Sequence, residues 1–130
     1  DSYNANPGSF RGVLQSIRFM HPKTPLIAVI GPMAELGENA EQLHKEVGEF
    51  IYDSGCKKLL VLGGDLGESY LEGWKNAGGP KEDAKRFESL EELQNDFQQD
   101  WDQKSIVLVK GSRSAAMERF VKAILNHESE

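Results

Sequence analysis

Apolar residues along the chain alternate between a helical spacing and short continuous runs. Residues 7–20 carry an apolar stripe at helical spacing, while residues 25–30 form an unbroken apolar run, typical of a strand covered on both faces. Asn6 and Pro7 suit the start of that first helix, as a cap and a first-turn residue. The same criteria predict helices around residues 43–51, 66–74, 90–97 and 117–125, and strands at residues 58–62, 84–87 and 105–109.

This strict alternation of helix and strand predicts an α/β fold. Right-handed crossovers between successive strands give a mostly parallel sheet with helices packed against it. Because the chain begins with a helix, a further strand is expected just before it, with Asp1 as its last residue and most of the strand missing. The chain shows no repeat or linker, so residues 1–130 are expected to form a single domain.

Composition narrows the functional classes. The 130 residues are 38% hydrophobic and 28% charged, as in ordinary globular domains, and the net charge of -6 argues against nucleic-acid binding. Cys56 is the single cysteine, which favours a reducing compartment. There is no apolar run long enough to span a membrane and no export leader, so a cytoplasmic location without membrane contact is expected.

The polar residues that could carry chemistry follow the predicted strands. In an open parallel sheet, ligands bind beyond the carboxyl ends of the strands. Four loops are expected at that edge, at residues 1–6, 31–37, 63–67 and 110–114. The sequence therefore predicts a ligand site formed by these loops.

The segment Lys110-Gly111-Ser112-Arg113-Ser114 lies between a strand and a helix. Two cations, two hydroxyls and the free N–H groups of a helix start could hold a phosphate or a carboxylate. An ordinary capped helix start with solvated charges explains the segment equally well. The segment is not a Walker A loop, because its order is Lys-Gly-Ser and no G-x-x-x-x-G-K-[ST] occurs in the chain.

The other candidate residues are less specific. Asp1 offers a carboxylate for a ribose hydroxyl or a metal, and Asn4 is not needed for a helix cap, which requires only Asn6. Glu35 could bind a ligand or be solvated. His44 lies close to an apolar stripe, where packing or capping is the commoner role. Paired Cys/His spacings and nucleophile motifs do not occur, so neither a metal centre nor a catalytic residue is predicted.

Three motifs resemble the carboxy-terminal domain of the Mur ligase family. They are D-S-Y-N-A-N-P, then G-P-M-A-E-L-G-E with its following Leu43-His44 and Val47-Gly48, and V-L-V-K-G-S-R-S. The resemblance runs from Asp1 to about Leu125. Within the family, it is to the member that joins D-alanyl-D-alanine to UDP-N-acetylmuramoyl-tripeptide in peptidoglycan synthesis.

The resemblance implies a Rossmann-like three-layer domain and two further domains, one for the UDP-sugar and a central one for ATP and Mg²⁺. In such enzymes ATP converts a peptide carboxylate into an acyl phosphate, which the incoming amine attacks. The last domain closes over the central one, and closure keeps the acyl phosphate from water. Without the P-loop, this chain alone is expected to be inactive, and the absent domains choose the third residue of the tripeptide.

The resemblance also implies roles for individual residues. Asp1 is expected near the ATP ribose, and the interdomain cleft beside the nucleotide is expected to be lined by Tyr3, Asn4 and Asn6. The free carboxylate of D-alanyl-D-alanine is expected to be bound by the segment Lys110, Gly111, Ser112 and Arg113. Glu35 and His44 match the family without a definite role. Pro32 replaces the usual acid of a G-D-M motif.

The main alternative is a receiver-type phosphoacceptor signalling domain. It requires an acceptor aspartate directly after the middle strand, but Leu62 is followed by Gly63-Gly64 before Asp65. A plain dinucleotide-binding domain ranks lower, because G-x-G-x-x-G is missing. The ligase interpretation makes a geometric prediction: residues 1–6 and 110–114 lie side by side at one rim of the sheet, facing a partner domain.

Overall fold

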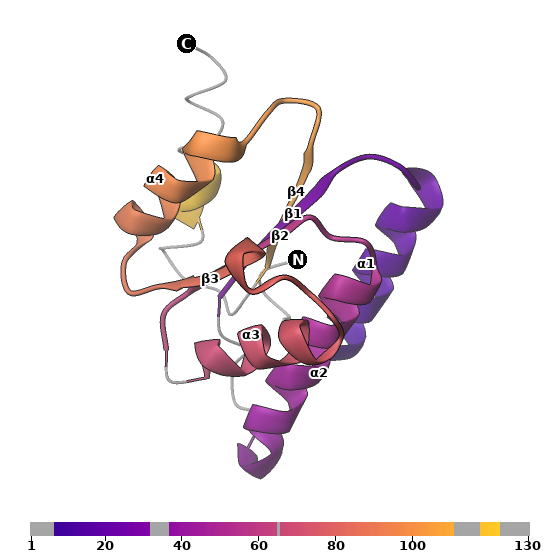
Figure 1. Cartoon of the computed structure of the whole chain (residues 1–130), viewed down its shortest axis with the longest axis vertical. Helices are drawn as coiled ribbons and strands as arrows, with labels where there is room; N and C mark the ends of the chain where they lie inside the picture. The colour runs from indigo at the N-terminus through magenta and orange to yellow at the C-terminus, as the bar shows by residue number, and fades with distance from the viewer. Residues whose placement is uncertain (1–6, 32–36, 65, 111–117, 123–130) are drawn as a thin grey trace.

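The computed structural model describes residues 7–31, 37–64, 66–110 and 118–122, and Figure 1 shows their arrangement. The α-helices are α1 (Pro7–Met20), α2 (Ala40–Asp53), α3 (Gly67–Asn76) and α4 (Leu90–Asp100). The strands are β1 (Leu26–Ile30), β2 (Lys58–Leu62), β3 (Ala84–Phe87) and β4 (Ile106–Lys110). Short 3-10 helices occupy Gly37–Asn39 and Lys81–Asp83, and residues 118–122 are helical.

Local sequence signals set several of these boundaries. Helix α1 begins at Pro7, as predicted. Helix α4 begins after Ser89, whose hydroxyl accepts a hydrogen bond from the Glu92 N–H at 3.2 Å, a capping contact that serine favours at a helix start. Helix α2 ends before Gly55, which adopts a φ of 83° that favours glycine.

The four strands form one parallel sheet in the order β3-β2-β1-β4. Strand β1 is central and all five of its residues are buried, as its continuous apolar sequence predicts. At its carboxyl end, Ile30 is in register with Val61 of β2 and Lys110 of β4. The prediction of a mostly parallel α/β sheet is therefore confirmed. The strand expected before α1 would include Asp1, which lies outside the described residues.

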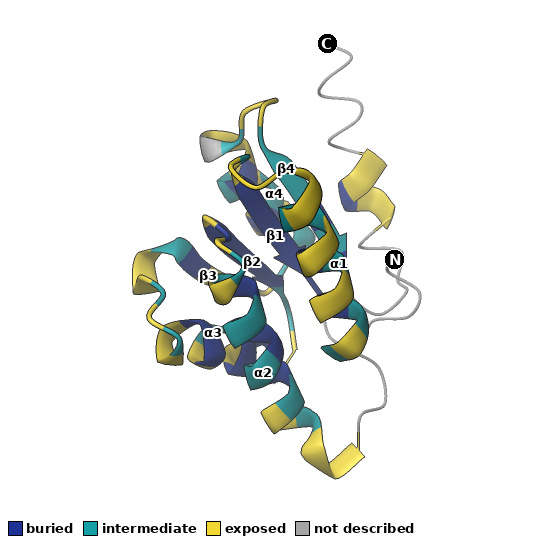
Figure 2. Ribbon diagram, turned by 90° about the vertical axis from the view of Figure 1, so that its right-hand side faces the viewer, coloured by how far each residue is buried: buried dark blue, intermediate teal, exposed yellow. Residues whose placement is uncertain are grey.

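Helices cover both faces of the sheet, which makes the three layers seen in Figure 2. Alternate residues of β1 point to opposite faces. Ala28 belongs to the core under α1, α2 and α3, whereas Val29 belongs to the core under α4 and the 118–122 helix, where Phe120 packs. None of the described helices is both long and apolar enough to cross a membrane.

Two glycines let α2 and α3 approach each other to backbone contact. A Cβ placed on Gly48 would collide with the backbone carbonyl oxygen of Tyr70, and one placed on Gly73 would collide with that of Lys45. Either collision would force the helices apart. This contact explains why a helix-disfavouring residue occupies the middle of each helix, and it fixes Tyr70 against α2.

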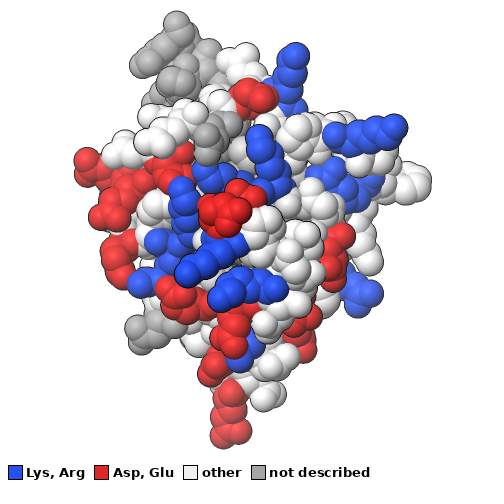
Figure 3. All heavy atoms as spheres, viewed as in Figure 1, with Lys and Arg blue, Asp and Glu red and all other residues white. Residues whose placement is uncertain are grey.

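Strand β3 is an outer strand of the described sheet, and ion pairs lie on both sides of it. Asp96 of α4 forms an ion pair with Lys58 at 2.9 Å and accepts a hydrogen bond from Lys85 at 2.8 Å. Arg86 pairs with Glu68 of α3 at 2.9 Å and also with Glu88. Basic and acidic side chains therefore lie next to one another on the face seen in Figure 3, with no large region of one sign.

Candidate functional site

The topology marks one position at the carboxyl edge of the sheet. The chain leaving β1 enters α2, which packs on one face, whereas the next described segment after β4 is the 118–122 helix, which packs on the other. Loops that diverge in this way open a crevice between neighbouring strands, where ligands bind in open α/β sheets. Here the two strand ends are joined by a 2.7 Å hydrogen bond from the Gly31 N–H to the Lys110 carbonyl oxygen.

Lys110 is the last residue of β4 rather than the first of a loop, and its side chain is fully buried. Its Nζ atom lies 5.4 Å from the centre of the Phe10 ring of α1, so a cation–π contact holds the start of α1 to the end of β4. Burial lowers the pKa of the Lys110 amine. Phe10 of α1 and Lys110 of β4 thus meet at one edge of the sheet. The segments that the ligase interpretation places side by side lie, apart from Lys110, outside the described residues.

His44 is also fully buried, on the first half of α2. Its Nδ1 atom lies 2.6 Å from the Ala40 carbonyl oxygen, so this nitrogen carries the proton and donates. Burial lowers the pKa of the ring, which is consequently neutral at pH 7. The Nε2 atom then bears a lone pair, and it has no hydrogen-bond partner among the described residues. The ring is buried, as its position close to the apolar stripe predicts.

Tyr70 was predicted only as an apolar position of a helix, but its hydroxyl reaches the candidate site. It is fully buried, and its ring centre lies 4.7 Å from that of His44. Its hydroxyl donates to the Gly31 carbonyl oxygen at 2.9 Å. The sequence offers one signal for this contact: a tyrosine occupies a buried helix position that a leucine could fill. A buried hydroxyl needs a hydrogen-bond partner, so the choice of tyrosine indicates one.

Most of the predicted site residues cannot be placed. Outside the described residues lie Asp1, Tyr3, Asn4, Asn6, Glu35, Gly111, Ser112 and Arg113. Pro32 and Asp65 lie there too. Of the predicted set, the structure brings together Lys110 and His44, through Gly31 and Tyr70. The described part of the chain contains no group of three acidic, histidine or cysteine side chains that could hold a metal ion.

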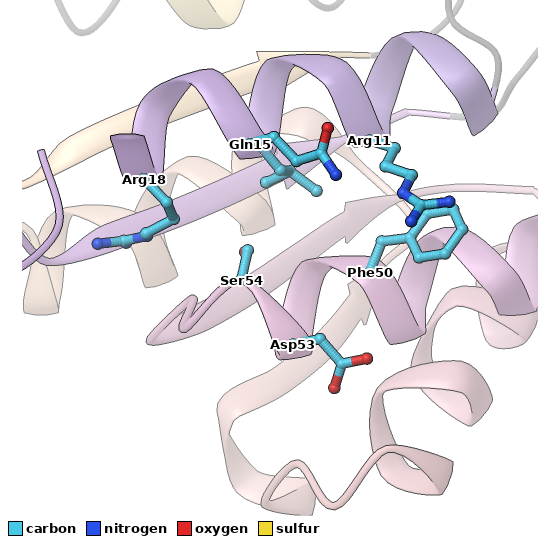
Figure 4. A pocket seen from close by; sticks show the side chains of 7 residues that line it. Arg11, Gln15, Arg18, Phe50, Asp53 and Ser54 are labelled. Carbon is cyan, nitrogen blue, oxygen red and sulfur yellow. The ribbon is translucent and has the colours of Figure 1, made fainter. Parts of the chain in front are cut away.

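A groove of about 420 Å³ lies between α1 and α2, away from this edge (Figure 4). It is lined by Arg11, Leu14, Gln15, Arg18, Phe50, Asp53 and Ser54. The Arg11 guanidinium lies over the Phe50 ring at 5.5 Å, and the Arg18 Nη1 donates to the Thr24 carbonyl oxygen at 2.9 Å. The first contact packs α1 against α2, and the second ties the last turn of α1 to the chain that follows it.

Comparison with known proteins gives one consistent result. The family described as "Mur ligase, glutamate ligase domain" matches residues 1–113. A relative named UDP-N-acetylmuramoyl-tripeptide–D-alanyl-D-alanine ligase, from Escherichia coli K12, is 36% identical over 95% of this chain and 26% of its own length. The Rickettsia prowazekii protein of the same name is 31% identical over 93% of the chain and 26% of its length. The chain thus spans about a quarter of these relatives.

Solved structures agree. A crystal structure of MurF from Acinetobacter baumannii superposes with a TM-score of 0.76 at 27% identity, covering 97% of this chain and 27% of that one. A receiver-type domain was the main alternative, and this family assignment shows it to be wrong. The family match over residues 1–113, the relatives and the solved structures together show that the chain belongs to the Mur ligase family, of which it is a carboxy-terminal domain.

Proposed function

We propose that this chain is the carboxy-terminal domain of a cytoplasmic, ATP-dependent ligase that joins D-alanyl-D-alanine to UDP-N-acetylmuramoyl-tripeptide. The observation that carries the proposal is the alignment with the E. coli ligase over 95% of the chain, together with the family match over residues 1–113, which includes residues 1–6 and 110–113. In the proposed reaction, a phosphoryl group passes from ATP to the tripeptide carboxylate. The amine of the dipeptide then attacks the acyl phosphate, and phosphate leaves.

The proposed part of this domain in the reaction is to complete a cleft rather than to supply a reacting group. Asp1, Tyr3, Asn4 and Asn6 are proposed to border the nucleotide, while Gly111, Ser112 and Arg113 hold the dipeptide carboxylate. An arginine can bind a carboxylate through two parallel hydrogen bonds, which a lysine cannot do. Both segments adjoin the described meeting point of α1 and β4. Glu35 keeps no assigned role.

Lys110 has a different proposed role from the residues that follow it. Its side chain has no exposed surface, so a ligand could not reach its Nζ atom without displacing the residues that cover it. A buried cation just before residues 111–113 would still raise the electrostatic potential there, because a low-dielectric surrounding screens it weakly. We therefore propose that Lys110 attracts the dipeptide carboxylate through its charge and does not form a hydrogen bond to it.

The described residues offer no cluster of metal ligands. The family resemblance assigns Mg²⁺ to a central domain, together with most of the ATP contacts. Two further domains, one for ATP and one for the UDP-sugar, would be the main partners of this chain.

The test is ADP release by the full-length enzyme in the presence of UDP-N-acetylmuramoyl-tripeptide, with and without D-alanyl-D-alanine. We expect release that depends on the dipeptide. Arg113→Ala should raise the KM for the dipeptide about tenfold to a hundredfold, since a charge-assisted pair contributes about 1.5–3 kcal/mol.

Arg119→Ala is the matched control, because Arg119 is an exposed arginine of the 118–122 helix. It should leave the KM for the dipeptide within a factor of two. Dipeptide-independent ADP release by the wild-type enzyme would refute the proposed function. An unchanged KM in Arg113→Ala would refute only the role of Arg113.

A further inference from the structure

Buried polar side chains gather at the carboxyl edge of the sheet. Among the described residues, the buried polar or charged side chains other than tyrosine are His44, Lys58, Ser69 and Lys110. Three of these four belong to the carboxyl edge, since Lys110 ends β4 and the other two lie in the first halves of α2 and α3, which begin there. Burying such groups costs free energy unless they have partners, so their concentration here calls for an explanation beyond core packing.

The contacts at this edge form one continuous path between helices and strand ends. The His44 ring, fixed by its Nδ1 bond to Ala40, packs on the Tyr70 ring. The Tyr70 hydroxyl donates to Gly31, and Gly31 donates to the Lys110 carbonyl oxygen. The path therefore runs from α2 and α3 to the last residues before the loops that follow β1 and β4.

We propose that Tyr70 is a positioning residue of this ligase, whose hydroxyl holds the Gly31 carbonyl and thereby fixes the ends of β1 and β4. This proposal rests on the proposed function, since the loop after β4 carries the residues assigned to the dipeptide carboxylate. The tyrosine is well placed for the task. Its backbone meets α2 at Gly48, and its ring meets His44, so the hydroxyl has little freedom to move.

The kinetic test uses Tyr70→Phe in the full-length enzyme, which removes only the hydroxyl. Losing this buried hydrogen bond should raise the KM for D-alanyl-D-alanine about fivefold to tenfold. The kcat and the KM for UDP-N-acetylmuramoyl-tripeptide should change less than twofold. A merely structural role would instead lower activity toward both substrates in proportion to lost stability.

Tyr52→Phe is the matched control. Tyr52 lies in the last turn of α2, about 12 Å along the helix from His44, and packs edge-on against Trp74. This variant should leave every kinetic constant within a factor of two. Equal changes in Tyr52→Phe and Tyr70→Phe, or an unchanged KM in Tyr70→Phe, would overturn the proposal.

Amide hydrogen exchange on the 130-residue chain separates this proposal from the proposed function. In Tyr70→Phe, the Gly31 N–H should exchange about tenfold faster than in the wild type, because its bond to Lys110 is no longer braced. The Leu60 N–H in β2 should not change. A wild-type enzyme without dipeptide-dependent ADP release would refute the ligase function, whereas an unchanged Gly31 exchange rate would refute the positioning role of Tyr70.

Discussion

Replacing Gly73 with alanine should destabilise the chain although alanine is the better helix former. An alanine Cβ at this position would lie 2.8 Å from the carbonyl carbon of Lys45 and closer still to its oxygen, whereas ordinary contacts begin at 3.4 Å. Neither side can yield by a rotamer change, because the obstruction is the backbone of α2. The helices must therefore separate.

The magnitude follows from two opposing terms. The Cβ would lie far inside contact distance of the Lys45 oxygen, so the helices must separate by about an ångström or more, which forfeits up to about half of the dispersion energy across the contact. Overpacking of a core costs about 1–3 kcal/mol, and a backbone obstruction belongs at the upper end. The gain in helix propensity is about 1 kcal/mol. The net expectation is a loss of about 2 kcal/mol in the free energy of unfolding.

Gly12→Ala provides the comparison. Gly12 lies within α1, is exposed and has no atom within 4 Å of its would-be Cβ. The same substitution should stabilise the chain there by about 0.5–1 kcal/mol. Urea unfolding followed by circular dichroism measures both. With slopes of about 1–3 kcal/mol per molar urea, the Gly73→Ala midpoint should fall by about 1 M. If the urea midpoint rose equally in Gly73→Ala and Gly12→Ala, the backbone contact between α2 and α3 would be refuted.

Two further predictions concern titratable groups, the half-buried Asp96 and the buried Cys56. Burial alone would raise the pKa of Asp96, but hydrogen bonds from Lys85 and Lys58 outweigh it and lower that pKa. The contribution of Asp96 to stability should therefore be present above about pH 4 and be lost as the pH falls through the lowered pKa of the folded state. Asp96→Asn should destabilise the chain by about 2 kcal/mol at pH 7. Unfolding curves measured in acid should show a smaller destabilisation. A destabilisation that does not vary with pH would contradict this. Burial raises the pKa of the Cys56 thiol to about 11, so iodoacetamide at pH 8 should alkylate it far more slowly in the native chain than in urea; equal rates would contradict its burial.

Much of the fold was predictable because each element has a local signature. Apolar periodicity located the helices and strands, and the Ser89 cap located the start of α4. Strand order was not predictable, because strands that are apolar throughout are buried on both faces and do not specify their neighbours. Only the structure revealed that β1 and β4 adjoin at the point where the chain diverges to opposite faces.

Within the described part of the candidate site, Lys110 and Tyr70 differ from what the sequence alone indicates. The prediction placed Lys110 in a loop facing a ligand, because a lysine after an apolar run resembles a strand end. In the structure it continues β4 and is buried against Phe10. Tyr70 was missed because its partner, Gly31, is 39 residues away, and helical spacing carries no information about such a contact.

Strand β3 gives the sheet a border that is poorly suited to growth. It is four residues long, and its two middle residues, Lys85 and Arg86, are engaged with carboxylates of α4 and α3. A strand arriving from a second molecule would gain few backbone hydrogen bonds there and would have to pack beside two charged side chains. Fibril formation through this border should therefore be unfavourable even in crowded solutions.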